Sequence, residues 1–222
     1  FLSMGEKVCT WLNDAGYTFC YGNNMAMNPE YCQPLSAWKQ YFSRWVNMGS
    51  AEDLLRTKIF FDFRSAYGEE AFEDALRDHL NQIVGDNHRF FQLLARNILP
   101  MAPPIGLFGN FIVESSGANR GSFDIKSSMM PIVDFARIYA LKNKIRAANT
   151  IRRLDALREM KVLSDQSHQE MVQAYSYLMQ IRLRIQAEAV SSRNSNPNNY
   201  IFPKTLTSIE QLQSGPDESR LS

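Results

Sequence analysis

The sequence predicts a mainly α-helical protein, an antiparallel helical bundle that carries a small β-hairpin and a short N-terminal strand. Apolar residues recur at helical spacing through most of the 222 residues, and the connections between these segments are short. Only a few short stretches have the composition of strands. Hydrophobic residues make up 45% of the chain, so a core can be buried and a wholly disordered chain is excluded.

The first half of the sequence alternates helical patterns with breakers. Apolar spacing predicts a helix over residues 1–15 that Gly16 ends, and the aromatic run Tyr17–Tyr21 is typical of a strand. Pro34 fits the first turn of a second helix, which carries several aromatic residues. Ser50 is a candidate N-cap for a third helix, which we expect to end at Gly68. Amphipathic patterns then predict helices over residues 69–84 and 87–99.

The second half contains the predicted hairpin. The stretches Leu107–Val113 and Ser122–Lys126 have strand composition, and the link between them is rich in glycine. Pro131 is expected to open a very apolar helix that reaches Leu141 and is buried on most sides. Further helices are predicted over residues 150–160 and 165–189, the latter capped by Ser164.

Charge and hydropathy exclude several classes of protein. The 24 basic and 23 acidic residues leave a net charge of +1, which argues against a strongly basic nucleic-acid binder but leaves room for a local basic stripe. No apolar run reaches the roughly 18 to 20 residues that cross a bilayer, so we expect no membrane association. The chain starts at Phe1 without a signal-peptide pattern, and we expect it to begin inside a longer protein.

The three cysteines, Cys9, Cys20 and Cys32, form no CxxC pair and lie far from every histidine in the sequence. Their odd number argues against a disulfide scaffold, and their spacing argues against a zinc site. We therefore expect reduced thiols in a cytoplasmic protein, with no bound metal.

Charged residues of the predicted hairpin are the first candidates for chemistry. Side chains alternate along a strand, so Asp124 and Lys126 are expected on one face, with Arg120 nearby. The two cations could hold an anionic group beside the carboxylate. The alternative is an exposed cross-strand ion pair without function.

Two helices supply further candidates. Arg137 lies inside the apolar helix, where it either neutralises Asp134, three residues earlier, or faces a ligand cleft. Arg182 and Gln186 stand at i and i+4 of the last helix and share a face. The forked guanidinium of Arg182 suits phosphate recognition, although a solvated polar stripe would have the same pattern.

We hypothesise that these groups converge on one anion-binding cleft between the hairpin and the bundle. Burying several cations together is costly unless anions meet them, so such a cleft would favour a phosphate. The alternative places each charged group on a separate surface with its own local partner. The predicted substrate-binding or phosphate-binding set is Arg120, Asp124, Lys126, Arg137, Arg182 and Gln186.

Several motifs follow one another in a familiar order: CYGNNMAMNPEY at 20–31, IFFDFR at 59–64, FGNF at 108–111, RGSFDIK at 120–126, PIVDFAR at 131–137, NTIRRL at 149–154 and RLRIQ at 182–186. Together they resemble the C-terminal part of bacterial nucleotidyltransferases that are often fused to cyclic-nucleotide-binding and CBS domains. These proteins are relatives of the uridylyltransferase that modifies the nitrogen-regulatory PII protein. The resemblance covers roughly residues 1 to 190.

The resemblance implies a division of labour between domains. In that family a nucleotidyltransferase domain comes first, with a Gly-Ser turn followed by an Asp-x-Asp pair for Mg²⁺ and the NTP, and this combination is absent from the present sequence. Residues 1–21 resemble the C-terminal edge of that domain, whose strand would be Tyr17–Tyr21. Residues 22–190 resemble its helical substrate-binding domain, and residues 191–222 depart from the pattern as a polar tail. We therefore assign no catalytic residue, metal ligand or cofactor to this fragment.

Three functions follow from these observations. The leading one is the substrate-binding portion of an enzyme that transfers a nucleotidyl group from an NTP to a protein or small acceptor, with Mg²⁺ and NTP held by the full-length protein. The expected partners are the upstream nucleotidyltransferase, CBS or cyclic-nucleotide-binding domains and a protein acceptor. The alternative is a non-catalytic ligand-sensing or protein-interaction module in a signal-transduction protein. A third, an RNA-end-modifying enzyme, conflicts with the neutral net charge.

Overall fold

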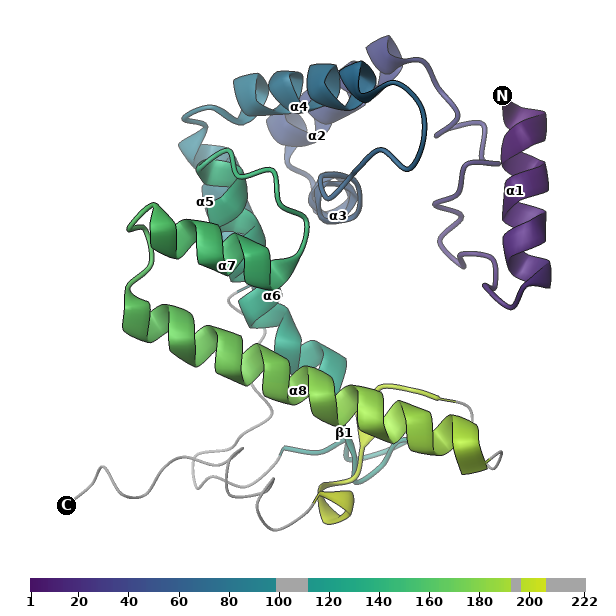
Figure 1. Cartoon of the computed structure of the whole chain (residues 1–222), viewed down its shortest axis with the longest axis vertical. Helices are drawn as coiled ribbons and strands as arrows, with labels where there is room; N and C mark the ends of the chain where they lie inside the picture. Colours follow the sequence, from purple (N-terminus) through teal and green to yellow (C-terminus); the bar gives the residue numbers. More distant parts are fainter. Residues whose placement is uncertain (99–111, 193–196, 207–222) are drawn as a thin grey trace. The chain divides into compact units, whose positions relative to one another are not determined.

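The computed structural model describes residues 1–98, 112–192 and 197–206. The chain divides into two compact units, Phe1–Phe90 and Phe91–Ser222. Within the described residues the fold is mainly helical and contains one small antiparallel sheet of two strands, which confirms the predicted fold class (Figure 1). In the same part of the chain, no helix combines the length and apolar character that crossing a membrane would need.

The first unit is built around aromatic side chains. Helix α2 (Leu35–Met48) packs against α3 (Ala51–Phe60) and α4 (Glu70–Val84). The core between these helices centres on Phe42 and Trp45, both almost fully buried. Phe42 contacts Phe61 with their ring centroids 4.7 Å apart, and Phe61 in turn contacts Phe90. The helices run as α1 (Leu2–Asp14), α2 (Leu35–Met48), α3 (Ala51–Phe60), α4 (Glu70–Val84) and α5 (His88–Ile98), the last of which crosses the boundary between the units.

Helix α1 lies close to the loop that follows it at one point. Gly5 is buried, and a Cβ atom built on it would stand 2.5 Å from the carbonyl oxygen of Ala26. No real Cβ tolerates that distance, and the neighbour is backbone rather than the end of a flexible side chain. A glycine at this position therefore permits the close approach of the loop to the helix.

The predicted start of α3 is confirmed and its predicted end is wrong. Ser50 forms a capping box, in which its Oγ accepts from the N–H of Asp53 (3.1 Å) and the Asp53 carboxylate accepts from the N–H of Ser50 (3.2 Å). The helix ends at Phe60 rather than at Gly68, because the chain turns there and buries Phe61 against Phe42. The predicted strand at Tyr17–Tyr21 is also wrong, since within the described residues it pairs with no other strand.

The second unit contains three mutually packed helices and the sheet. Their shared core includes Leu154 and Leu157, both fully buried. A second apolar cluster joins Ile181 of the long helix α8 (Asp165–Ser192) to Phe123 and Ile201 of the sheet. The elements are β1 (Phe123–Asp124), α6 (Ile125–Lys142), α7 (Thr150–Glu159), α8 (Asp165–Ser192), β2 (Tyr200–Ile201) and the 3₁₀ helix η1 (Pro203–Thr205).

The predicted hairpin has a different partner. Of its first strand, residues 107–111 lie outside the described residues, and residues 112–113 are not in a strand. The second strand is shorter than predicted, and β1 pairs antiparallel with β2, Phe123 opposite Ile201. Burial explains the choice, because this register places both side chains in the apolar cluster beside α8. The intervening loop is nevertheless closed, since the N–H of Glu114 donates to the carbonyl of Ser122 (2.8 Å).

The apolar helix begins six residues earlier than predicted. Pro131 lies inside α6 instead of opening it, and the helix starts at Ile125 with Asp124 as its N-cap. The Asp124 side chain accepts from an N–H of the first turn, and this hydrogen bond stabilises a helix start upstream of Pro131. Pro131 has no N–H, so the carbonyl one turn before it lacks its usual helical partner. The predicted cap of α8 is confirmed, because the N–H of Ser167 donates to Ser164 Oγ (3.1 Å).

We expect Ser50→Ala to lower the free energy of unfolding of the first unit by about 1 kcal/mol, because the α3 capping box is lost. Tryptophan fluorescence during urea unfolding measures this, since all three tryptophans lie in the first unit. Ser36→Ala, in the exposed first turn of α2, is the matched control and should change stability by less than about 0.5 kcal/mol. Equal losses in the two variants would contradict a role for the cap.

Candidate functional site

The start of α6 organises the first group of predicted site residues. The Asp124 carboxylate accepts from the backbone N–H of Lys126 (2.9 Å) and from the hydroxyl of Ser127 (2.7 Å). Lys126 is therefore in the first turn of a helix, and the predicted shared strand face of Asp124 and Lys126 is wrong. The exposed side chain of Lys126 makes no ion pair within the described residues.

Helix α8 contributes the second group. Arg182 donates through Nε to the side-chain oxygen of Asn199 (2.9 Å), and Gln186 donates through Nε2 to the same oxygen (3.4 Å) and to the carbonyl of Asn198 (3.2 Å). Both residues thus contact one short segment, which confirms that they share a helix face. Among the described residues, no group accepts from the terminal N–H groups of the Arg182 guanidinium.

Asn199 joins these two groups. Its backbone carbonyl accepts from the N–H of Ile125 (3.0 Å), the first residue of α6, while its side chain accepts from Arg182 of α8. We call this arrangement the Asn199 corner: Asp124, Lys126, Arg182, Gln186 and Asn199. Sequence reasoning missed Asn199, although the asparagine-rich stretch after the last helix marked a polar loop.

Arg120 is not tied to the corner by any described contact. It is exposed in the closed loop between Glu114 and Ser122, and its backbone N–H donates to the carbonyl of Gly117 (3.3 Å). The neighbouring Gly121 has a positive φ of 82° and approaches the ring of Phe202. The loop therefore packs near η1, with the Arg120 side chain in solvent.

Arg137 is engaged elsewhere on α6. Its guanidinium pairs with Asp134 (2.6 Å), whose side chain is 1% exposed. This confirms the intrahelical pair that the spacing predicted. Arg137 stands eleven residues beyond Lys126 on the same helix, a rise of roughly 16 Å. The structure therefore brings Arg182 and Gln186 to Asn199, which also contacts the start of α6 next to Asp124, but it does not bring Arg137 to them.

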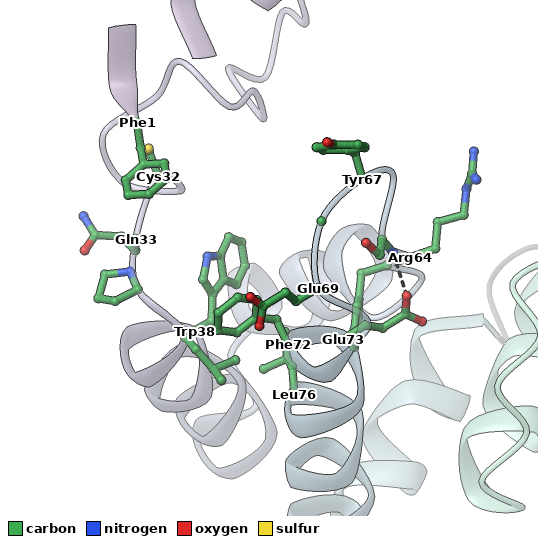
Figure 2. Close-up of a pocket in the computed structure, with 15 residues that line it drawn as sticks. Phe1, Cys32, Gln33, Trp38, Arg64, Tyr67, Glu69, Phe72, Glu73 and Leu76 are labelled. Carbon is green, nitrogen blue, oxygen red and sulfur yellow. Dashed lines mark hydrogen bonds between the residues drawn. The ribbon is translucent and has the colours of Figure 1, made fainter. Parts of the chain in front are cut away.

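A cavity of about 780 Å³ lies in the first unit (Figure 2). Its walls come from the start of α2, the start of α4 and the loop between α3 and α4, and they are mostly apolar. Trp38, Phe63 and Phe72 supply aromatic surface, and Glu69 and Glu73 supply carboxylates. The helical spacing of Trp38 and Phe63 in the sequence predicts that both are core residues, whereas sequence reasoning did not single out Phe72, Glu69 or Glu73.

The loop on one side of this cavity is fixed by Arg56 of α3. Its guanidinium bridges Glu30 (2.6 Å) and Glu52 (2.9 Å) and also donates to the Tyr31 hydroxyl (3.3 Å). Hydrogen bonds to Glu52 and Glu30 raise the pKa of Arg56 above its already high ordinary value. The segment that leads to Cys32 at the cavity wall is therefore held against α3.

All three cysteines are free thiols. Cys20 is exposed, and hydrogen bonds from the backbone N–H groups of Asn24 and Gly22 lower the pKa of its thiol from the usual range. The positive φ of Asn23 (54°) shapes the turn that presents these donors. Across the described residues, no group of three or more His, Cys, Asp or Glu side chains could hold a metal ion.

The fold and the Asn199 corner together define a helical module with unpaired cationic side chains beside the start of a helix. A family model for a putative nucleotidyltransferase substrate binding domain matches residues 88–213, more than half of the chain. The chain therefore belongs to that family. A second model, for a putative nucleotidyltransferase, matches residues 1–52.

The family assignment confirms the resemblance drawn from the motifs, whereas the fusion partners, the relation to the PII uridylyltransferase and the predicted domain boundaries stay predictions. No curated protein matches the chain. No solved structure matches it either.

We expect Cys20 to react with iodoacetamide at neutral pH faster than Cys9 or Cys32, because its lowered pKa leaves more of the reactive thiolate. Peptide mass spectrometry after short labelling measures the three rates. In urea, without reductant, the three thiols should label at similar rates and all three should be found. Equal rates in the folded protein would contradict the backbone donation to Cys20.

Proposed function

We propose that this chain is the substrate-binding portion of a nucleotidyltransferase that moves a nucleotidyl group from an NTP to a protein or small acceptor. The Asn199 corner is the part of it that contacts phosphate. The chain itself performs no chemistry in this proposal. A cytoplasmic location, in which its three thiols stay reduced, belongs to the same proposal.

The observation that carries the proposal is the coincidence of the family match with unpaired cations. The matched region, residues 88–213, contains the whole Asn199 corner. Within it, Arg182 donates to Asn199 through Nε alone. The two terminal nitrogens of its guanidinium remain able to donate in the forked geometry that suits phosphate oxygens. Lys126 adds a second cation in the first turn of α6, where the helix dipole also favours an anion.

The corner has the chemistry of binding rather than of catalysis. Its carboxylate, Asp124, already accepts from the Lys126 N–H and the Ser127 hydroxyl, so it caps the helix instead of serving as a base. Asn199 holds Arg182 in place, which lowers the entropy lost when a phosphate is bound. What these residues can do is orient a charged group and offset its charge.

The described residues do not fit a magnesium centre, because no cluster of acidic side chains is present among them. The sequence also contains no Asp-x-Asp pair. The proposal therefore assigns Mg²⁺ to another part of the enzyme.

We expect Arg182→Ala and Lys126→Ala each to weaken binding of NTPs by about threefold to tenfold, because each removes a charge-assisted contact. Equilibrium titration with fluorescent analogues of the four ribonucleoside triphosphates measures this, and the affinities should fall as salt rises. Arg184→Ala is the matched control, since Arg184 lies on the same helix and pairs with Glu188 (3.8 Å). Equal effects of Arg182→Ala and Arg184→Ala would overturn the assignment of the corner.

We expect the purified chain to transfer no nucleotide, since it lacks the Asp-x-Asp pair that metal-dependent nucleotidyl transfer would use. Incubation with labelled NTPs and Mg²⁺, followed by electrophoresis and thin-layer chromatography, tests this on both protein and small acceptors. Metal-dependent labelling at enzymatic rates would contradict the proposal. NTP binding without transfer by a longer protein that retains Asp-x-Asp would favour the signalling module instead.

A further inference from the structure

The cavity of the first unit has no role in the proposed function. All of its lining residues belong to Phe1–Phe90, whereas the Asn199 corner belongs to the second unit. Its volume, about 780 Å³, lies within the range of cavities that hold small molecules. Ligand binding in this cavity can therefore be tested separately from nucleotide binding at the Asn199 corner.

Several aromatic rings line the cavity. Phe72, on α4, is 60% exposed, and Phe1 and Tyr67, which also line the cavity, are fully exposed. Trp38 is half-buried, and part of its ring packs against Tyr31 and Phe60. The guanidinium of Arg77 lies 4.4 Å from the ring centroid of Phe63. Phe72 therefore offers an open ring to a ligand, and Trp38 offers the part of its ring that the neighbouring aromatic side chains leave uncovered.

The charges around the cavity are unevenly used. Glu73 accepts from Arg77 (2.9 Å) and from the backbone N–H of Ser65 (2.6 Å). The carboxylate of Glu69 has no hydrogen-bond or ion-pair partner among the described residues and makes no capping bond at the start of α4, although the backbone carbonyl of Glu69 accepts from the N–H of Phe72 (3.2 Å). Figure 2 shows its carboxylate directed toward Trp38 and Phe72, while the guanidinium of Arg64 extends away from the cavity.

We propose that this cavity binds a small organic cation, an ammonium or guanidinium group carried on an apolar body. A cation is attracted by the faces of Trp38 and Phe72 and by the unpaired carboxylate of Glu69. An anion would be repelled by Glu69. A neutral apolar molecule would fill the walls and leave the carboxylate unmatched.

The nearby Arg77 does not reverse this selectivity. Its charge is offset by Glu73, and it lies over the ring of Phe63. The concave shape and volume of the cavity, which is open to solvent on one side, favour a small molecule over the flat surface of a partner protein. The apolar body of the ligand occupies the space beside Leu35 and Leu76, which line the same cavity.

The test uses the whole chain and three probes of similar shape: 2-phenylethylammonium, 2-phenylethanol and 3-phenylpropanoate. Ligand-observed NMR and titration of tryptophan fluorescence give the affinities. The cation is expected to bind most tightly and the carboxylate most weakly. Equal binding of the cation and the neutral alcohol would overturn the proposal.

Variants localise the effect. Glu69→Gln should weaken binding of the cation by about threefold to fivefold and leave binding of the alcohol unchanged, as expected for an exposed charge pair. Glu70→Gln, the neighbouring acidic residue that does not line the cavity, is the matched control. Phe72→Ala should weaken both ligands, and an unchanged circular dichroism spectrum shows that it folds. Equal effects of Glu69→Gln and Glu70→Gln would also overturn the proposal.

Discussion

The double use of Asn199 is the interaction on which the second unit depends. Its carbonyl accepts from the first N–H of α6, and its side chain accepts from Arg182 on α8. Because both bonds come from one residue, the segment that follows α8 is held against two helices at once. Ile201 is thereby placed beside Phe123 and Ile181, and the smaller apolar cluster is closed. The cluster is small, so the apolar area that it buries does little to fix its geometry. The hydrogen bonds of Asn199 at its edge do more to fix that geometry.

Local signals in the sequence predicted most of the helices. Ser50 and Ser164 are short polar residues directly before apolar periodicity, and both act as caps in the structure. The errors arise where distant parts of the chain decide the outcome. Tyr17–Tyr21 has strand composition, but a strand needs a neighbour, and composition does not say whether one is present. Pro131 was expected to open a helix, yet Asp124 provides a competing cap seven residues upstream of the predicted start.

The candidate site was predictable to the same degree. The helical period alone placed Arg182 and Gln186 on one face, and the i, i+3 spacing paired Arg137 with Asp134. The period could not show that Asn199 would return to that face, since a polar loop carries no periodic signal. The cavity beside Trp38 was missed for another reason. An aromatic residue at helical spacing has the same pattern whether its ring is fully packed or half open to a cavity.

The pairing of β1 with β2 has a consequence for how the second unit folds. The two strands are separated in sequence by the whole of α6, α7 and α8. Closing so long a loop lowers the conformational entropy of the chain by more than the pairing of two short strands alone can offset. Each helix, in contrast, forms from residues that are neighbours in the sequence. We therefore expect the three helices to assemble first and the sheet to join them late in folding. The segment that contains Asn199 and β2 can then detach while the three helices stay folded. Its backbone amides should therefore exchange hydrogen faster than those of the helical core.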